Sequence, residues 1–516
     1  MPRPSSKPIQ LLKGFKDILP EHQDHWEFIR NKAKELFSSH GFSRIDVPIL
    51  EQTNLYVKGT GKHTDIVEKE LYSFEDKGGD DITVRPEFTP GICRAYIEHG
   101  MLNKSQPVKL YSLGPVFRHD NPQSGRYRQF HQLNLESIGS ESPVIDAELV
   151  IIAYRFLEAL GLPVEVQINS IGGIEERTEF ILKLKQFLQS GGRKKELCDS
   201  CKSRFAKNTL RILDCKQSTC QEILSEAPQI VDFLSEDSKK HFMAVLEYLD
   251  DLEIKYNLNV KLVRGLDYYN RTTFEIYVTG EDTEKSQGAL VGGGRYDGLI
   301  EILGGRPTPA AGFAIGIERV VKKLREKQVE IPRAKVVDVF LAQLGVEARK
   351  ECFKLHQKLL DEKIKVNHAF SKDGLKAQLE RADTDGAKMA LILGQKELMD
   401  NTIIIRDMQS GIQEIINYDK AVDQVKKRID SALSEVKSYR LDVPGSDHTT
   451  DENGDKIDFD KPLKKKDKVF KSSLEIEDDG LLKEDVSSGK DSDEDDHDDQ
   501  KTKKSKDDSS SKDDES

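Results

Sequence analysis

This chain of 516 residues has few cysteines and no long hydrophobic run. No apolar run approaches the roughly 18 residues of a membrane-spanning helix, so no membrane association is expected. The opening MPRPSSKPIQ lacks the apolar stretch of a secretory signal. Six cysteines are too few for a secreted disulfide scaffold of this length. We therefore expect a soluble, cytoplasmic protein of several domains.

Aromatic residues make up only 7% of the chain and are rarest near its C-terminal end. Residues 441–516 contain two phenylalanines but neither tyrosine nor tryptophan. They also hold 14 Lys and 26 Asp or Glu, so they carry the whole net charge of −12. Blocks of like charge with so little apolar surface cannot offset the chain entropy lost on folding. We expect 439–516 to be a disordered acidic tail, either a solvating extension or a docking segment.

The rest of the chain alternates helical and strand-like patterns, which indicates a mixed α and β body. Apolar residues at helical spacing predict a helix at 24–40, with Asp24 as its cap and Gly41 at its end. Two strands are predicted at 109–118 and 129–138. The loop between them is rich in turn residues, as in a hairpin.

Changes in composition predict the domain organisation. A Lys- and Glu-rich, mainly helical segment at 172–258 is expected to be an insertion within a domain formed by 1–171 and 259–325. Residues 326–335 have the composition of a linker. Buried-strand patterns with a helix between them predict a small α/β domain at 336–438.

The second strand of the predicted hairpin carries a polar row. Alternation places Gln132, Asn134 and Glu136 on one face and two leucines on the other. An ordinary strand with one solvated face is the simplest explanation of this pattern. The alternative is a sheet that forms the floor of a polar ligand site.

Arginines stand beside this row and beside glycines elsewhere in the chain. Arg118, Arg126 and Arg128 flank the row, while Arg264 and Arg319 lie in the runs LVRGLDYYN and GFAIGIERV. Arg suits bidentate phosphate contacts, and glycine lets a backbone approach a ligand closely. Phosphate or RNA is therefore a candidate partner. The run VGGGRYDGLI has neither Walker nor Rossmann spacing, so a tight turn or bulge is an alternative for it.

Four of the six cysteines lie close together in the sequence, within the predicted insertion: Cys198, Cys201, Cys215 and Cys220. The first pair has the spacing of a zinc knuckle, and the second pair is more widely spaced. A structural zinc held by four thiolates is one hypothesis, and free buried thiols in a reducing compartment are the other. No open ligand position is evident, so no catalytic metal is predicted.

Five runs carry more information together than separately: RPEFT at 85–89, FRHDNPQSGRYRQFHQLNLESIG at 117–139, RGLDYYN at 264–270, GGGRYDGL at 292–299 and GFAIGIERV at 312–320. Together they resemble the histidyl-tRNA synthetases, a class II aminoacyl-tRNA synthetase family. The similarity covers about residues 8–437, and RGLDYYN and GGGRYDGL are particular to the histidyl branch.

The resemblance implies an α+β fold, with a class II antiparallel sheet flanked by helices and an anticodon-binding domain at 336–437. It also implies a ligase that activates L-histidine with ATP. The reaction forms histidyl-adenylate and releases pyrophosphate, and the histidine is then transferred to the 3′ end of tRNA(His). ATP and Mg²⁺ are then expected, together with a homodimer, because VPILE at 47–51 resembles the family's dimer-forming motif. Such catalysis rests on positioning and charge stabilisation, without a protein nucleophile.

Roles for individual residues also follow from the resemblance. Arg118 and Arg264 are the implied catalytic residues, on either side of the α-phosphate. Arg319, with Arg126, would bind the rest of ATP. The implied histidine-binding residues are Glu87, Phe88, Thr89, Gln132, Glu136, Tyr268 and Tyr269.

The hairpin loop matches a different part of the family pattern. Gln123 and Arg128 stand where the family reads the acceptor end of the tRNA. The run RPEFTPG departs from the pattern, because Phe88 and Pro90 replace the usual Gly and Ala. Phe88 is therefore expected to add bulk beside the pocket.

Two other functions fit parts of the sequence. The regulatory subunit of ATP phosphoribosyltransferase shares this fold without aminoacylating. Such paralogues typically lose the arginine of RGLDYY or the anticodon-binding domain, and both are present here. A generic nucleotide-binding scaffold would account for the glycines, but it leaves the histidyl-specific runs unexplained.

Overall fold

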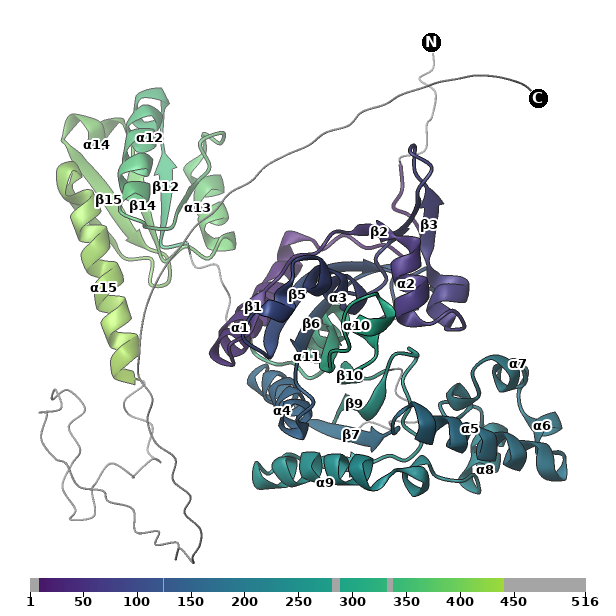
Figure 1. Ribbon diagram of the computed structural model, residues 1–516. Coiled ribbons are helices and arrows are strands. Elements are labelled where there is room, and N and C mark those ends of the chain that lie inside the picture. Colours follow the sequence, from purple (N-terminus) through teal and green to yellow (C-terminus); the bar gives the residue numbers. More distant parts are fainter. Residues whose placement is uncertain (1–8, 124, 281–287, 332–336, 440–516) are drawn as a thin grey trace, which may run out of the picture. The chain divides into compact units, whose positions relative to one another are not determined.

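The computed structural model describes residues 9–123, 125–280, 288–331 and 337–439 (Figure 1). Nearly all of the predicted acidic tail at 439–516 lies outside the described residues. Among the described helices, none is both long and apolar enough to cross a membrane.

An eight-stranded sheet forms the centre of the main body. From one edge to the other, its strands are β1 (Ser43–Arg44), β5 (Val108–Phe117), β6 (Gln129–Ile138), β11 (Ala310–Gly316), β10 (Val291–Arg295), β9 (Asn270–Val278), β7 (Val164–Ser170) and β8 (Tyr256–Leu258). The six inner strands pair antiparallel, whereas each edge strand is parallel to its neighbour. Parallel pairing needs a crossover connection, and long connections do separate β1 from β5 and β7 from β8. The inner strands form the predicted antiparallel sheet, and one parallel strand extends it at each edge.

Four helices share one apolar core with the sheet: α1 (Gln23–Ser39), α4 (Pro143–Ala159), α9 (Glu236–Asp251) and α11 (Ile317–Glu326). Leu133 and Leu135 of β6 point into this core. Since successive side chains of a strand alternate, Gln132, Asn134 and Glu136 face the other side of the sheet. That side carries α3 (Thr89–Glu98) and α10 (Leu299–Ile302).

The start of α1 differs from the sequence prediction. Its N-cap is His22, and no side chain caps it, so the capping role predicted for Asp24 is wrong. The chain enters α1 through a 3-10 turn at Pro20–His22, which places the helix start one residue earlier than predicted. The helix ends at Ser39, and Gly41 adopts a left-handed φ of 79° just beyond it.

A smaller sheet lies beside the main one. Its strand order is β2 (Leu50–Gln52), β4 (Asp81–Val84) and β3 (Tyr72–Glu75). Helix α2 (Thr53–Thr60) and a π-helical turn at Ile66–Glu70 connect these strands.

The inserted helices follow β7 and are grouped together beyond it in Figure 1. They are α5 (Ile174–Gln189), α6 (Arg193–Glu196), α7 (Asp199–Lys207) and α8 (Ser218–Ser225). The predicted insertion at 172–258 also includes α9 and β8, yet α9 packs on α4 and β8 extends the main sheet. Residues 236–258 therefore belong structurally to the main body.

The C-terminal part is a second α/β unit with its own core. Its sheet order is β13 (Val366–His368), β12 (Val339–Gln343), β14 (Met389–Leu393), β15 (Thr402–Asp407) and β16 (Gln413–Asn417). Its helices are α12 (Val346–Asp361), α13 (Leu375–Thr384), α14 (Gln395–Met399) and α15 (Ala421–Tyr439). Strands β12 and β14 are buried along their whole length, as predicted from their continuous apolar runs.

Candidate active site

The predicted hairpin forms, with each strand within one residue of its expected position, and its polar row is buried. Gln132, Asn134 and Glu136 are 8%, 1% and 1% exposed. A strand with one solvated face is thereby excluded. Buried polar groups normally have hydrogen-bond partners, yet the Gln132 and Asn134 side-chain oxygens have none among the described residues. Of the two, only Gln132 lines the cavity described below, so its oxygen is an acceptor available to a bound molecule.

A cavity of about 790 Å³ opens over this side of the sheet. Most of the residues selected from the sequence line it: Glu87, Thr89, Arg118, Arg126, Gln132, Arg264, Tyr268, Tyr269 and Arg319. They come from segments that are far apart in the sequence, and the antiparallel order of β6, β11, β10 and β9 brings them together.

One end of the cavity is built around a buried carboxylate. The Tyr268 hydroxyl donates a hydrogen bond to Oε2 of Glu87 over 2.9 Å, while Oε1 of Glu87 has no described partner. Burial raises the pKa of Glu87, against the opposing effects of Arg118 and the Tyr268 hydrogen bond. Tyr269 packs against Tyr268 with ring centroids 4.6 Å apart. This end suits a small ligand that brings its own hydrogen-bond donors.

Glu136 lies behind the cavity wall. Thr89 donates its hydroxyl to Oε1 of Glu136 over 2.6 Å, and Tyr296 donates to Oε2. Both donors line the cavity, whereas Glu136 itself does not. Burial raises the pKa of Glu136 to about 8. Glu136 thus holds Thr89 and Tyr296 in place at the cavity wall, and its own contact with substrate stays a prediction.

Phe88 also points away from the cavity. Its ring is 1% exposed in the core beneath α3, and the Arg85 guanidinium lies 4.2 Å from the ring centroid. Arg85 in turn donates to the carbonyl oxygens of Val47 and Pro115. The predicted bulk in the pocket is therefore not found, because the ring fills space in the core.

The cavity is also rich in arginine, and Arg118 lies close to Glu87, since its positive charge opposes the rise that burial causes in the pKa of that carboxyl. Arg118 Nε donates to the Pro86 carbonyl oxygen over 2.9 Å, and Arg319 Nη1 donates to the Ala289 carbonyl oxygen over 2.9 Å. Burial lowers the pKa of Arg319, and the positive charges of Arg126 and Arg118 lower it further. Arginines that repel one another in a cavity favour a multiply charged anion as ligand.

Arg264 lies in the loop before β9, and its guanidinium reaches Glu275 of β9 and Gly292 of β10. It forms an ion pair with Glu275, and its guanidinium lies 5.7 Å from the Tyr269 ring centroid. Burial disfavours its charged form, but Glu275 and the two tyrosines nevertheless raise the pKa of Arg264. A Cβ on Gly292 would overlap the Arg264 guanidinium. The GGG run is thus a strand with a bulge after Gly294, and its first glycine makes room for this arginine.

Some lining residues were not selected from the sequence. Glu275 and Tyr277 line the cavity from β9, two residues apart and so on one face of the strand. Alternation along the run that begins RGLDYYN could have identified them. Tyr296, in GGGRYDGL, also lines the cavity.

The insertion supplies four further lining residues: Arg204, Arg211, Asp214 and Lys216. Arg204 pairs with Asp65 of the main body over 3.4 Å, and Lys207 pairs with Glu68 over 2.9 Å. Nothing in the sequence predicted this contact, because it joins segments about 140 residues apart in the chain.

The two residues expected to read tRNA lie in the hairpin loop. Gln123 is exposed and forms an isolated bridge with Arg126. The Arg128 backbone amide donates to the Gly14 carbonyl oxygen over 2.7 Å, which fixes the loop to the N-terminal segment. Neither residue lines the cavity, although Arg126 of the same loop does, so the two residues lie beside its rim.

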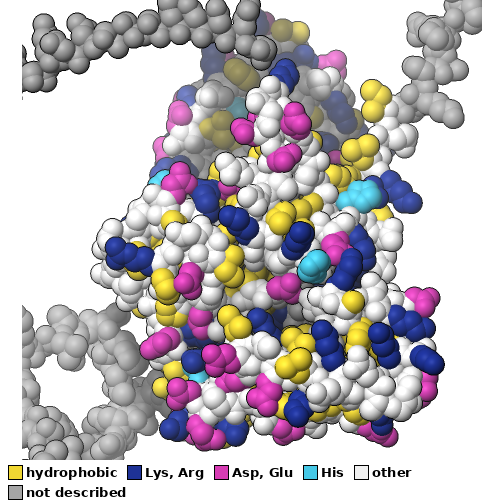
Figure 2. All heavy atoms as spheres, turned by 45° about the vertical axis from the view of Figure 1, so that its right-hand side comes forward, with side chains coloured by type: hydrophobic (Ala, Val, Ile, Leu, Met, Phe, Trp, Pro, Cys, Tyr) yellow, Lys and Arg dark blue, Asp and Glu magenta, His cyan; other side chains and the backbone are white. Residues whose placement is uncertain are grey.

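The positive charge is a local feature of the cavity. Figure 2 shows Lys and Arg side chains interspersed with Asp and Glu side chains over the face that it presents. This distribution agrees with the overall neutrality of residues 1–440, where positive and negative charges balance. The arginines of the cavity therefore indicate an anionic ligand rather than a generally basic protein.

Comparisons with known proteins agree with this site. Residues 14–320 match the family profile described as histidyl-tRNA synthetase, and residues 335–428 match that of an anticodon binding domain. Histidine–tRNA ligases of two Dehalococcoides mccartyi strains are 43% and 42% identical over 418 residues, which is 81% of this chain and 99% of each relative.

Solved structures show the same relationship. The apo histidyl-tRNA synthetase of S. aureus is 36% identical, with a TM-score of 0.69 over 81% of this chain and all of the other. The enzyme from Nostoc sp. PCC 7120, at 19% identity and a TM-score of 0.58 over 81% of this chain and 99% of the other, shows the shared fold alone. The predicted class II α+β fold with an anticodon-binding domain is thus confirmed, and with it the family: this chain belongs to the histidyl-tRNA synthetases.

Proposed function

We propose that this chain is a histidine–tRNA ligase whose cavity holds histidine and ATP side by side. The carrying observation is that one cavity is lined by two chemically different sets of groups. The first set is the buried carboxylate of Glu87 with the unpaired acceptor of Gln132, and the second is Arg118, Arg126 and Arg319. An amino acid with cationic and imidazole donors suits the first set, and a triphosphate suits the second.

Histidine recognition would rest on polar groups at the carboxylate end. Glu87 and Gln132 offer free acceptors to the ammonium group and to the imidazole N–H. Thr89 is held in place by Glu136, and Tyr268 by Glu87. A site built from such buried pairs discriminates strongly against analogues that leave a partner unpaired.

The reaction in this cavity needs charge stabilisation rather than a nucleophile from the protein. The histidine carboxylate attacks the α-phosphorus of ATP, and pyrophosphate leaves. Arg118 and Arg264 are proposed to contact the α-phosphate, with Arg319 and Arg126 on the departing phosphates. Because Glu275 holds Arg264 and backbone carbonyls hold Arg118 and Arg319, the guanidinium groups are positioned before the substrate binds.

Magnesium would enter with ATP, as the family implies. Mg²⁺ is usually held by one or two carboxylates together with phosphate oxygens. Glu70 and Glu275 both line the cavity and fit this role, because Glu70 lies near Arg118 and Glu275 beside Arg264. Burial raises the pKa of Glu70, so a cation would stabilise its charged form. Bound Mg²⁺ would neutralise charge on the phosphates.

The tRNA would engage two surfaces. Gln123 and Arg128 in the hairpin loop are proposed to contact its acceptor end, beside the cavity where the adenylate forms. The unit at 335–428 matches an anticodon binding domain and is proposed to contact the anticodon of tRNA(His).

We also propose a cytoplasmic homodimer. Ile49 and Leu50, in the segment that resembles the dimer-forming motif, are 43% and 48% exposed. A second copy of the chain would cover them. Light scattering that showed an active monomer would contradict the dimer, and cell fractionation would test the location.

The proposed reaction is tested by exchange of labelled pyrophosphate into ATP, with each of the other amino acids as a control. Exchange that depends on histidine alone is expected. Histidine binding without exchange would instead indicate a binding-only paralogue. Charging of a tRNA(His) transcript then tests the second step.

A further inference from the structure

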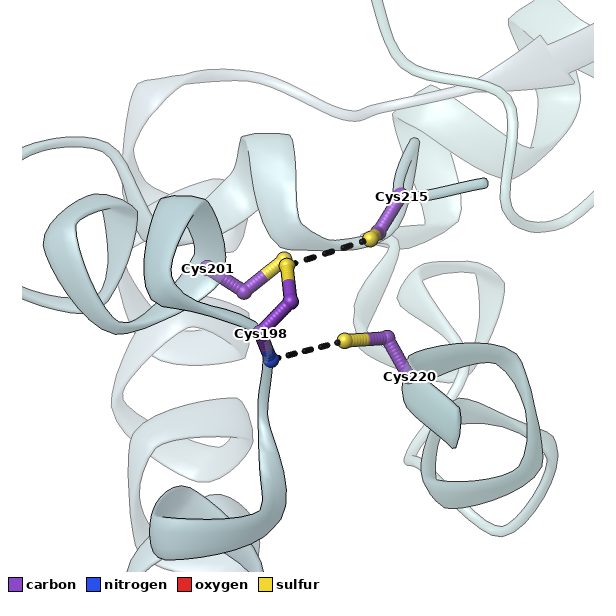
Figure 3. A group of neighbouring side chains, drawn as sticks. All are labelled: Cys198, Cys201, Cys215 and Cys220. Atoms are coloured by element: carbon purple, nitrogen blue, oxygen red, sulfur yellow. Dashed lines mark hydrogen bonds between the residues drawn. The ribbon is translucent and has the colours of Figure 1, made fainter. Parts of the chain in front are cut away.

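Four cysteines of the insertion converge on one point: Cys198, Cys201, Cys215 and Cys220 (Figure 3). They come from the start of α7, from α7 itself, from the turn before α8 and from α8. Their sulfur atoms all lie within 4.8 Å of one another. Of the four, Cys201 and Cys220 are fully buried, Cys215 is 6% exposed, and Cys198 is half-buried.

The geometry distinguishes a metal site from a pair of disulfides. A disulfide requires sulfur atoms about 2.05 Å apart. The Cys198 and Cys215 sulfurs are 3.8 Å apart, and all six cysteines are free. Tetrahedral zinc with Zn–S bonds of about 2.3 Å places its sulfur ligands roughly 3.8 Å from one another. The observed pair thus already has the separation of two zinc ligands.

The backbone around the cluster also suits thiolate ligands. The Cys198 amide donates to the Cys220 sulfur over 3.3 Å, a hydrogen bond that stabilises negative charge on that sulfur. Cys198 and Cys201 have the two-residue spacing of a knuckle at the start of a helix, where the macrodipole favours anions. Simple burial of thiols would not require four of them to meet.

We propose that these four cysteines bind a structural zinc ion. Four protein ligands complete its tetrahedral shell, so the ion has no open position for catalysis. Metal binding would contribute directly to the folding free energy of the insertion.

The ion would also fix a cavity wall. The segment between Cys201 and Cys215 carries Arg204 and Arg211, which line the cavity and lie 3.4 Å and 3.8 Å from Asp65 of the main body. Because both ends of this segment are ligands, the metal would hold its arginines at the mouth of the cavity. This is a positioning role, and it does not touch the chemistry itself.

Metal analysis of the full chain, purified in reducing buffer without chelator, is the direct test. We expect about one zinc per chain. Cys201→Ser and Cys215→Ser should each lose the metal, whereas Cys352→Ser, which changes a buried thiol in the C-terminal unit, should retain it. Substoichiometric zinc in the wild type, or zinc kept by both cluster variants, would overturn the proposal.

A second measurement avoids variants that fail to fold. Exchange of the bound metal for Co²⁺ in the wild-type chain should produce the visible and thiolate charge-transfer bands of tetrahedral sulfur coordination. Titration with a thiol reagent should find Cys198 protected until a chelator is added. An absence of cobalt bands together with fewer than six free thiols in the unfolded chain would show disulfides instead.

Discussion

The Tyr268 hydroxyl donates to Oε2 of Glu87 over 2.9 Å and leaves the second carboxylate oxygen buried and unpaired. That oxygen costs folding free energy unless a ligand donates to it. We therefore expect Glu87→Gln to raise the KM for histidine by about 10- to 100-fold in pyrophosphate exchange. Glu75→Gln, on the exposed strand β3, is the matched control and should leave this KM unchanged. Equal changes of this KM in the Glu87→Gln and Glu75→Gln variants would exclude a contact between Glu87 and histidine.

A second prediction separates binding from chemistry at Arg264. Its guanidinium is held by Glu275 and is proposed to meet charge that develops only as the adenylate forms. Arg264→Ala should therefore lower the rate of adenylate formation by roughly 10²- to 10³-fold, while the Kd for histidine changes little. Single-turnover kinetics and calorimetry measure the two quantities. Arg155→Ala, on the surface of α4, is the control. Similar losses in rate and in histidine binding would refute a transition-state role.

The raised pKa of Glu136, about 8 against a usual 4.5, gives a pH-dependent stability. Below pH 4.5 both the folded and the unfolded chain hold this proton, and between there and pH 8 only the folded chain does. The stability contributed by the protonated carboxyl is thus complete at low pH and is lost as the pH rises through this window. Glu136→Gln cannot ionise. The free energy of unfolding of this variant in urea, relative to that of the wild type, should rise from pH 5 to pH 8. A difference that stays constant with pH would contradict the raised pKa of Glu136.

The strands and the cavity could be predicted to different degrees. The hairpin at 108–138 and the helix at 23–39 were predicted to within one residue, because turn residues and apolar periodicity are local signals. The directions in which the Phe88 and Glu136 side chains point could not be predicted from the sequence. Phe88 lies under Arg85, and Glu136 lies behind Thr89 and Tyr296, so both depend on contacts between distant segments.

The insertion shows the same limit. Its cysteine spacing was informative, but the placement of Arg204 and Arg211 at the cavity depends on how α7 docks on the main body. The lengths of the connections do not specify that docking. Likewise, α9 reads as part of a helical insertion, yet its apolar face packs with α4 in the main core.

The position of Phe88 predicts an effect on stability. Because the ring is buried under α3 and outside the cavity, Phe88→Ala should cost about 3–5 kcal/mol of unfolding free energy. Phe88→Leu keeps most of the volume and should leave the KM for histidine within about twofold of the wild type. Urea unfolding and pyrophosphate exchange measure the two outcomes. A changed amino-acid specificity in Phe88→Leu would mean that the side chain reaches the substrate.

The mutual repulsion of the arginines predicts opposite effects on the free and the ATP-bound protein. Burial and the charges of Arg126 and Arg118 lower the pKa of Arg319, so its charge is unfavourable while the cavity holds no anion. Arg319→Gln should therefore leave the Tm of the free protein unchanged or higher. The same variant should raise the KM for ATP by about tenfold or more, since one charge-assisted phosphate contact is lost. Arg325→Gln, further along α11, is the control. A lower Tm without ATP, together with an unchanged KM, would show that Arg319 acts only within the fold.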